Sequence, residues 1–270
     1  MNLEDKLVEA ELILQEAVSR FRPSQLFVLF SGGHDSLSVT HFTVERLPAT
    51  PVVHLHTGIG LPETRQFVQE TATRQHWRLL EYPTPVRYED IVLKEGFPGP
   101  PRHNVMYALL KERSLRQLIR THKQDRHDRI MLVSGVREQE SLRRMKRLKQ
   151  MEKEGVRIWV APFWRLSKLE VNEYIHSRNL QRSPVVDLIH KSGECLCGAF
   201  ARKGEFKELS LWFPNTAAYI RDLECRVIAA GFPWGWEERP PKQYLLEKHG
   251  QQRLFAPLCA SCERQTEEME

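Results

Sequence analysis

The sequence predicts an α/β protein in which a parallel sheet carries helices on both faces. Three short apolar runs, at residues 27–30, 52–56 and 130–133, have the composition of strands buried on both sides. Segments with helical apolar spacing follow the first two runs, as expected where strands and helices alternate. A turn with two adjacent glycines joins the first run to its helix, which is an arrangement that binds anions at a helix N-terminus.

Length and composition support a folded core and a mild preference for anionic ligands. The 270 residues, 41% of them hydrophobic, suit one large domain or a domain with an appendage. Lys and Arg number 40 against 35 Asp and Glu, and this net charge of +5 does not by itself indicate a nucleic-acid-binding protein. The chain has no run of 18 apolar residues, and its N-terminus is acidic rather than typical of a signal peptide. We therefore expect a cytoplasmic protein with no membrane partner.

The first elements are an amphipathic helix over residues 2–21 and then the strand, turn and helix of residues 26–47. Two glycines alone would also fit an ordinary tight turn. Here they let backbone N–H groups approach an anion without an intervening side chain, and phosphate is the expected ligand. The residues expected to bind it are Ser31, Gly32, Gly33, Asp35 and Ser36.

The second strand and helix, residues 52–56 and 62–77, enclose a loop at the carboxyl end of the strand. Ligands bind at this edge of an open parallel sheet, so Thr57 and Gly58 are candidate cofactor-binding residues. Residues 82–102 are rich in proline and glycine and predict an irregular, lid-like loop.

The remaining elements are a long helix over residues 104–121, strands at 130–133 and 158–160, and a helix that a capping box opens at Ser167. Lys111, on the long helix, is either a solvated lysine or a nucleotide ligand. The basic run at residues 143–149 is either a solvated helix face or a track for a nucleic-acid backbone.

Four segments together resemble the phosphoadenosine phosphosulfate (PAPS) reductase, or CysH-like, family of the PP-loop adenine nucleotide alpha-hydrolase superfamily. They are SGGHDS, HTGIGLPET, SGVREQESLRR and APFWRLSKLEVNEYIHSRNL, which begin at residues 31, 56, 134 and 161. The resemblance covers about residues 26–200, although His56 stands where the family usually has Asp. It implies a Rossmann-like, HUP-type fold that binds ATP and Mg²⁺.

The resemblance also implies roles for single residues. Asp35 would help to hold magnesium, while Arg137 and Arg144 would close over the phosphoryl oxygens, a task that suits the planar fork of arginine. These three residues are the predicted catalytic set. Gly135 and Arg137 would join the cofactor-binding residues, as would Lys111, although the cysteine that often precedes this lysine in the family is missing here.

Five cysteines in a cytosolic chain argue against a disulfide framework, and their close pairs favour a metal. The pairs supply four thiolates, enough for zinc or a 4Fe-4S cluster, and the resemblance favours iron-sulfur. The predicted ligands are Cys195, Cys197, Cys259 and Cys262. Cys225 would be a structural cysteine on a helix. We divide the chain into a nucleotide domain, residues 1–190, and a mostly helical, cysteine-containing extension, residues 191–270.

The resemblance predicts an enzyme that cleaves ATP at the alpha phosphate, activates a substrate by adenylylation and releases pyrophosphate. Nucleic-acid sulfur modification of the DndC-like kind is the leading role, and an accessory of type IV CRISPR systems is a close alternative. The chain lacks the Glu-Cys-Gly-x-His-type segment of assimilatory reductases, so we expect no release of sulfite from PAPS. A reductase and a non-catalytic nucleotide-binding subunit of a modification complex remain as alternatives.

Overall fold

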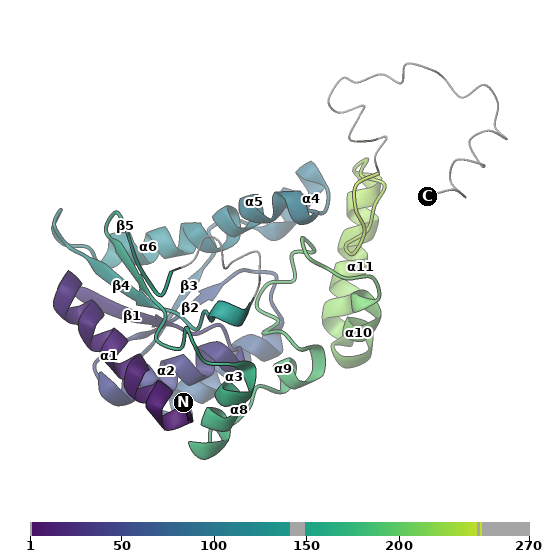
Figure 1. Ribbon diagram of the computed structural model, residues 1–270. Coiled ribbons are helices and arrows are strands. Elements are labelled where there is room, and N and C mark those ends of the chain that lie inside the picture. Colours follow the sequence, from purple (N-terminus) through teal and green to yellow (C-terminus); the bar gives the residue numbers. More distant parts are fainter. Residues whose placement is uncertain (1, 141–148, 242–243, 245–270) are drawn as a thin grey trace, which may run out of the picture.

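Six strands make up the central sheet of the computed structural model, which describes residues 2–140, 149–241 and 244 (Figure 1). They are β1 (Gln25–Leu29), β2 (Val52–His56), β3 (Leu79–Pro83), β4 (Ile130–Val133), β5 (Met151–Glu154) and β6 (Arg157–Val160). Their order is β3-β2-β1-β4-β6-β5, and every neighbouring pair is parallel except β5 with β6. The predicted parallel sheet is confirmed. The sequence did not predict β3 as a strand, nor the charged edge strand β5.

Helices cover both faces of this sheet, as predicted. The α-helices of the described residues are α1 (Leu3–Phe21), α2 (His34–Arg46), α3 (Pro62–Arg74), α4 (Tyr88–Glu95), α5 (His103–Tyr107), α6 (Arg113–His122), α8 (Lys168–Ser177), α9 (Pro184–Ile189), α10 (Glu205–Trp212) and α11 (Pro214–Ala229). One apolar cluster packs α1, α2, α3 and α8 on one face, and another packs α6 on the opposite face. No helix in the described part of the chain is both long and apolar enough to cross a membrane.

A third apolar cluster lies beyond the carboxyl ends of the strands and holds the C-terminal helices. It joins α4, α9, α10 and α11 to the loop after β2 and to Cys197. The Trp236 indole donates to the carbonyl of Leu196 at 2.6 Å, and the Tyr88 hydroxyl donates to the carbonyl of Cys197 at 2.8 Å. Residues on both sides of position 190 therefore share this cluster, and the proposed domain boundary there stays a prediction.

The prediction of an irregular loop over residues 82–102 is wrong. Its start belongs to β3, and α4 follows, with Tyr88 and Val92 buried in the third cluster. Prolines at positions 85 and 98 lie outside α4, so they bound a short helix instead of excluding one. Only eight residues long, α4 has too little apolar periodicity to stand out in such a segment.

The long helix expected over residues 104–121 is interrupted. A π-helical turn, η2 (Ala108–Glu112), separates α5 from α6. The hydroxyl of Thr84, just after β3, donates to the carbonyl of Leu109 within this turn at 3.1 Å. Such turns are frequent at functional sites, and this one carries Lys111.

Candidate functional site

The turn between β1 and α2 is closed by its own two serines. The Ser36 hydroxyl donates to the carbonyl of Gly33 at 2.9 Å and accepts from the backbone N–H of Ser31 at 3.2 Å. The two hydroxyl oxygens lie 3.1 Å apart. Since α2 begins at His34, the free N–H groups of its first turn lie in this loop. The loop, called the phosphate loop below (residues 31–36), thus offers the positive end of a helix to an anion.

Two glycines allow the phosphate loop to pack closely on its neighbours. Gly32 has the left-handed φ of +77°, and a Cβ there would lie 2.9 Å from Cγ2 of Thr64. A Cβ on Gly135, after β4, would lie 2.7 Å from the backbone carbonyl of Asp35. At Gly33, by contrast, φ is −82° and a Cβ would lie 3.4 Å from the Ser192 side chain. The fold itself does not require glycine at Gly33, so its backbone is free to serve a ligand.

Two cationic side chains contact the carboxylate of Asp35. Arg137 donates from Nε to Asp35 Oδ1 at 3.0 Å and from Nη2 to Oδ2 at 3.3 Å, while its Nη1 reaches the Leu166 carbonyl at 3.4 Å. Lys168, the first residue of α8, places Nζ 3.3 Å from Asp35 Oδ1. Arg137 is buried and Lys168 is largely exposed. Two cations against one carboxylate leave an excess of positive charge beside the phosphate loop.

His34 lies buried at the start of α2. Arg182 Nη2 lies 3.4 Å from His34 Nδ1 and forms a 2.6 Å ion pair with Asp187, whose Oδ1 is 3.8 Å from His34 Nε2. Burial, together with the charges of Arg182 and Lys168, lowers the pKa of His34 to about 4. His34 is therefore neutral at pH 7.

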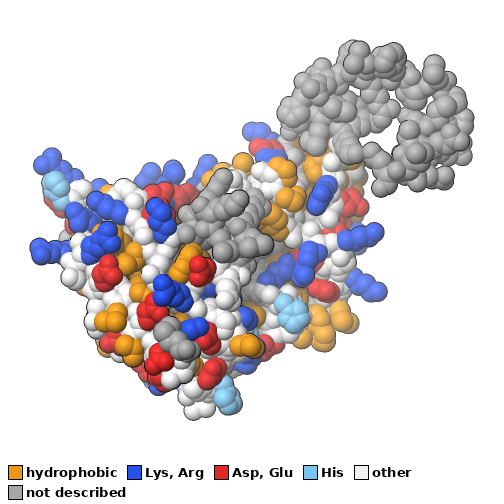
Figure 2. All heavy atoms as spheres, viewed as in Figure 1, with side chains coloured by type: hydrophobic (Ala, Val, Ile, Leu, Met, Phe, Trp, Pro, Cys, Tyr) orange, Lys and Arg blue, Asp and Glu red, His pale blue; other side chains and the backbone are white. Residues whose placement is uncertain are grey.

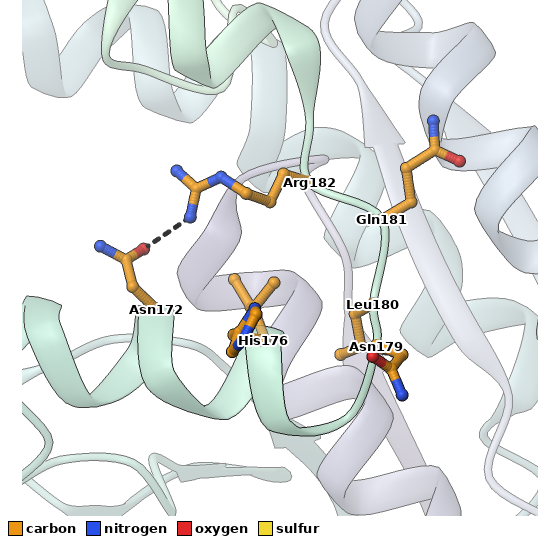
Figure 3. A pocket seen from close by; sticks show the side chains of 7 residues that line it. Asn172, His176, Asn179, Leu180, Gln181 and Arg182 are labelled. Atoms are coloured by element: carbon orange, nitrogen blue, oxygen red, sulfur yellow. Dashed lines mark hydrogen bonds between the residues drawn. The ribbon is translucent and has the colours of Figure 1, made fainter.

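Arg182 also borders a surface pocket of about 380 Å³ (Figure 3). Its guanidinium donates to Asn172 Oδ1 at 3.2 Å across the pocket, as the dashed line in Figure 3 marks. The lining residues are Asn172, Ile175, His176, Asn179, Leu180, Gln181 and Arg182. Arg182 thus connects this pocket to the phosphate loop through His34.

Thr57 and Gly58 lie at the carboxyl end of β2, where the sequence places them. Glu194 binds both hydrogen-bond donors of Thr57, since Glu194 Oε1 accepts from Thr57 N at 2.9 Å and the Glu194 carbonyl accepts from Thr57 Oγ1 at 2.5 Å. Gly58 has a φ of +74°, which the turn requires. A cofactor contact of Thr57 stays a prediction.

Lys111 and the first cysteine pair lie near one another. The thiol of Cys197 donates to Cys195, and this hydrogen bond, assisted by the positive charge of Lys111, lowers the pKa of Cys195 to about 6 although burial acts to raise it. The same hydrogen bond and burial raise the pKa of Cys197. A lowered pKa favours the thiolate form of Cys195, which is the form that binds metals.

Several predicted residues lie outside the described part of the chain: Arg144, Cys259, Cys262 and residues 143–148 of the basic run. Within the described ranges, no three His, Cys, Asp or Glu side chains gather as metal ligands do, so the four-thiolate site stays a prediction. Cys225 lies on α11 as expected, but its side chain is exposed, so the prediction of a structural cysteine is wrong. On the face shown in Figure 2, basic and acidic side chains are interspersed.

Comparison with known proteins identifies the family. Residues 25–194 match the family model described as "Phosphoadenosine phosphosulfate reductase domain". The chain belongs to this family. The four sequence segments quoted above all lie within the matched region, and the resemblance that rests on them is confirmed. The DndC-like or CRISPR subgroup within the family stays a prediction.

Individual relatives come from more than one kind of enzyme. A "Probable FAD synthase" of Caenorhabditis elegans is 30% identical over 101 residues, which is 35% of this chain and 20% of that protein. This chain therefore matches about one fifth of that relative's length. A PAPS reductase from Candida auris in complex with phosphate has a TM-score of 0.50 at 19% identity, covering 67% of this chain and 84% of that one. An FMN adenylyltransferase from Candida glabrata has a TM-score of 0.51 at 11% identity, covering 69% and 59%. These two structures share the fold of this family member.

Several polar residues at the edge of the family domain were not predicted as site residues. Lys168 lies inside the segment that begins at residue 161, which predicted a helix and the family but no site role for this lysine, and Arg182 follows that helix. His54 offered a clearer signal, because it interrupts the apolar run of a buried strand, where a charged ring needs specific partners. Its partner Glu194 could not be identified, since 140 residues separate the two in the sequence.

Proposed function

We propose that this chain is an enzyme that binds ATP at the phosphate loop and transfers its adenylyl group to an acceptor, releasing pyrophosphate. The observation that carries the proposal is the loop itself, with Gly32 in the left-handed region, the N-terminus of α2, and Arg137 and Lys168 beside it. Family membership and the match to a probable FAD synthase support the use of an adenine nucleotide.

In this mechanism the chain supplies position and charge. Backbone N–H groups of residues 31–36 hold phosphate oxygens, and Arg137 offsets the charge that develops on the alpha phosphate, assisted by Arg144. Asp35 keeps Arg137 in place through two parallel hydrogen bonds. Asp35 is also the proposed ligand of Mg²⁺, and a metal there would take the place of Lys168, which makes a single contact to Oδ1.

A metal centre is the second part of the proposal. Cys195 and Cys197 fit one half of a thiolate site, because a hydrogen bond joins their side chains and the pKa of Cys195 is lowered. We propose that Cys259 and Cys262 complete it, with a 4Fe-4S cluster or, alternatively, zinc. When bound, a cluster would supply sulfur or redox chemistry, whereas zinc would stabilise the fold.

The acceptor has two candidates, each favoured by one observation. The cysteine pair beside Lys111 favours sulfur chemistry, with a nucleic acid as acceptor in modification or defence. The 101-residue match to a probable FAD synthase favours transfer to flavin mononucleotide. Two further alternatives are a PAPS or adenylyl-sulfate reductase and a subunit that binds a nucleotide without turning it over.

The test is incubation of the anaerobically purified chain with ATP and Mg²⁺, alone and with FMN, sulfate or duplex DNA, followed by chromatography of the nucleotides. We expect AMP or an adenylylated product together with pyrophosphate. Formation of ADP and phosphate would overturn cleavage at the alpha phosphate. FAD as product would select the flavin, and sulfite released from PAPS in the presence of thioredoxin would instead select the reductase. ATP binding without any product would support the alternative that the chain is a non-catalytic, nucleotide-binding subunit.

A further inference from the structure

A buried histidine and a buried glutamate connect the sheet to the cysteine-bearing segment. His54, in the middle of β2, is fully buried, and its Nδ1 lies 2.8 Å from the carbonyl oxygen of Phe30. Its Nε2 lies 3.0 Å from Oε2 of Glu194, whose side chain is also buried. Phe30 is the residue that precedes the phosphate loop, and Glu194 is the residue that precedes Cys195.

The partners of His54 determine its charge. A backbone carbonyl oxygen lies beside Nδ1 and a carboxylate oxygen lies beside Nε2, and two such acceptors favour the protonated ring. Burial opposes this charge, but Glu194 and the Phe30 carbonyl outweigh it and raise the pKa of His54. Because a buried ion pair is rarely better for stability than well-packed apolar residues, a role other than stability has to be sought for it.

Glu194 holds a segment that extends from the phosphate loop to the cysteines. This segment, residues 192–197, contacts His54 and Thr57 through Glu194. It also binds the loop after β2 through its backbone, since Leu61 N donates to Gly193 O at 2.9 Å and Leu196 N donates to Ile59 O at 3.2 Å. At its start, the Ser192 side chain lies beside Gly33 of the phosphate loop. Residues 192–197 therefore touch the nucleotide end of the site and also carry the thiols.

We propose that His54 and Glu194 are a positioning pair that fixes the Cys195–Cys197 turn at a set place relative to the phosphate loop. The inference rests on the proposed function, since it gives the pair the task of aligning the cysteine turn with the reacting end of the nucleotide. Neither residue belongs to the phosphate loop. They act through the backbone of residues 192–197.

The experiment compares Glu194→Ala with Glu194→Gln in the full-length, anaerobically purified chain. Glutamine can still accept from Thr57 N and donate to a neutral His54, so it keeps the arrangement without the charge. We expect Glu194→Ala to speed amide hydrogen exchange in residues 57–61 and 192–198 by about tenfold or more, with exchange in β4 unchanged, and Glu194→Gln to restore slow exchange. For ATP turnover, we expect kcat to fall by about 100-fold in Glu194→Ala with KM for ATP within about threefold of wild type.

His41→Ala is the matched control, because His41 is a mostly buried histidine whose Nδ1 lies 2.9 Å from the Tyr174 hydroxyl, away from this segment. It should lower the melting temperature but leave exchange in residues 192–198 and kcat unchanged. Unchanged exchange in Glu194→Ala would overturn the positioning role, as would a Glu194→Gln variant no better than Glu194→Ala. If the wild type turns over no ATP, the proposed function fails, and the exchange measurement still decides whether the pair holds the cysteine turn.

Discussion

Gly135→Ala should disturb the phosphate loop without imposing an unfavourable backbone conformation. The new Cβ would lie 2.7 Å from the carbonyl of Asp35 and 2.8 Å from the backbone nitrogen of Ser36, where ordinary contact begins at 3.4 Å. The phosphate loop must therefore retreat by about 0.7 Å. Overpacking of this kind costs about 1–3 kcal/mol, which lowers the melting temperature of a chain of this size by roughly 2–12 °C.

The retreat should also weaken ATP binding. Hydrogen bonds from backbone N–H groups weaken once donor and acceptor leave the range of about 2.7–3.2 Å, and a loss of about 1.4 kcal/mol makes the dissociation constant tenfold larger. We expect calorimetry to give a dissociation constant for ATP about tenfold above that of the wild type.

Gly155→Ala is the control for this experiment. Gly155 has a φ of +60°, and no atom of the described residues lies within 4 Å of the place that a Cβ would take. Alanine there costs about 1–2 kcal/mol of backbone strain alone. Its ATP affinity should equal that of the wild type. If Gly135→Ala binds ATP as tightly as Gly155→Ala does, the phosphate loop of residues 31–36 is not the nucleotide site.

Three further predictions concern the phosphate loop, the thiols and pH. Gly33→Val should abolish ATP binding measured by calorimetry while the melting temperature changes little, because φ at this position is −82° and the atom nearest to a Cβ there lies 3.4 Å away. Serine at any of the four predicted cysteine ligands should release the metal, measured by metal and sulfide analysis, whereas Cys225→Ser should retain it because its side chain lies exposed on α11. His34 has its pKa lowered to about 4, so the unfolded chain binds the proton first and the free energy of unfolding should fall as the pH drops from about 6.5 to 4, by up to about 3 kcal/mol.

Each of these has a result that would contradict it. For the phosphate loop, it is unchanged ATP affinity in Gly33→Val. For the thiols, it is full metal content after serine replacement of Cys259 or loss of metal in Cys225→Ser. For His34, urea unfolding at pH 7 and pH 5 should show a smaller pH effect in His34→Gln than in the wild type, and equal effects would show that His34 does not titrate as its burial requires.

The sequence predicted most of the fold because its strands and helices have strong local signals. The apolar runs that became β1 and β4 are short and continuous, and His54 interrupts the run of β2. The capping box at Ser167 marks the start of α8. The edge strand β5 escaped prediction because its sequence, MEKE, is charged and only its pairing with β6 makes it a strand. The strand β3 and helix α4 escaped because nearby prolines and glycines obscured two short elements that tertiary packing stabilises.

The candidate site likewise contains residues that local sequence signals predict and contacts that they do not. Residues 31–36 were predictable, since a glycine turn between a strand and a helix is formed by neighbouring residues and binds anions at the helix N-terminus. The contacts of Arg137 with Asp35, and of Glu194 with His54, join residues more than 100 positions apart, and only the fold brings them together. Periodicity and spacing carry no information about such pairs. They also could not indicate that Thr57 binds Glu194 within the protein.

The two cations around Asp35 differ in how readily a metal ion would displace them. Arg137 is buried and bonds both carboxylate oxygens, whereas Lys168 is largely exposed and makes one contact of 3.3 Å, a kind of ion pair that contributes roughly 0–1 kcal/mol. A divalent cation arriving with ATP would therefore displace Lys168 before it displaced Arg137. The freed ammonium group would then lie beside the phosphate loop, where it could neutralise a phosphate oxygen. Asp35 would thus serve both proposed roles, bonding Arg137 and accepting the metal in place of Lys168.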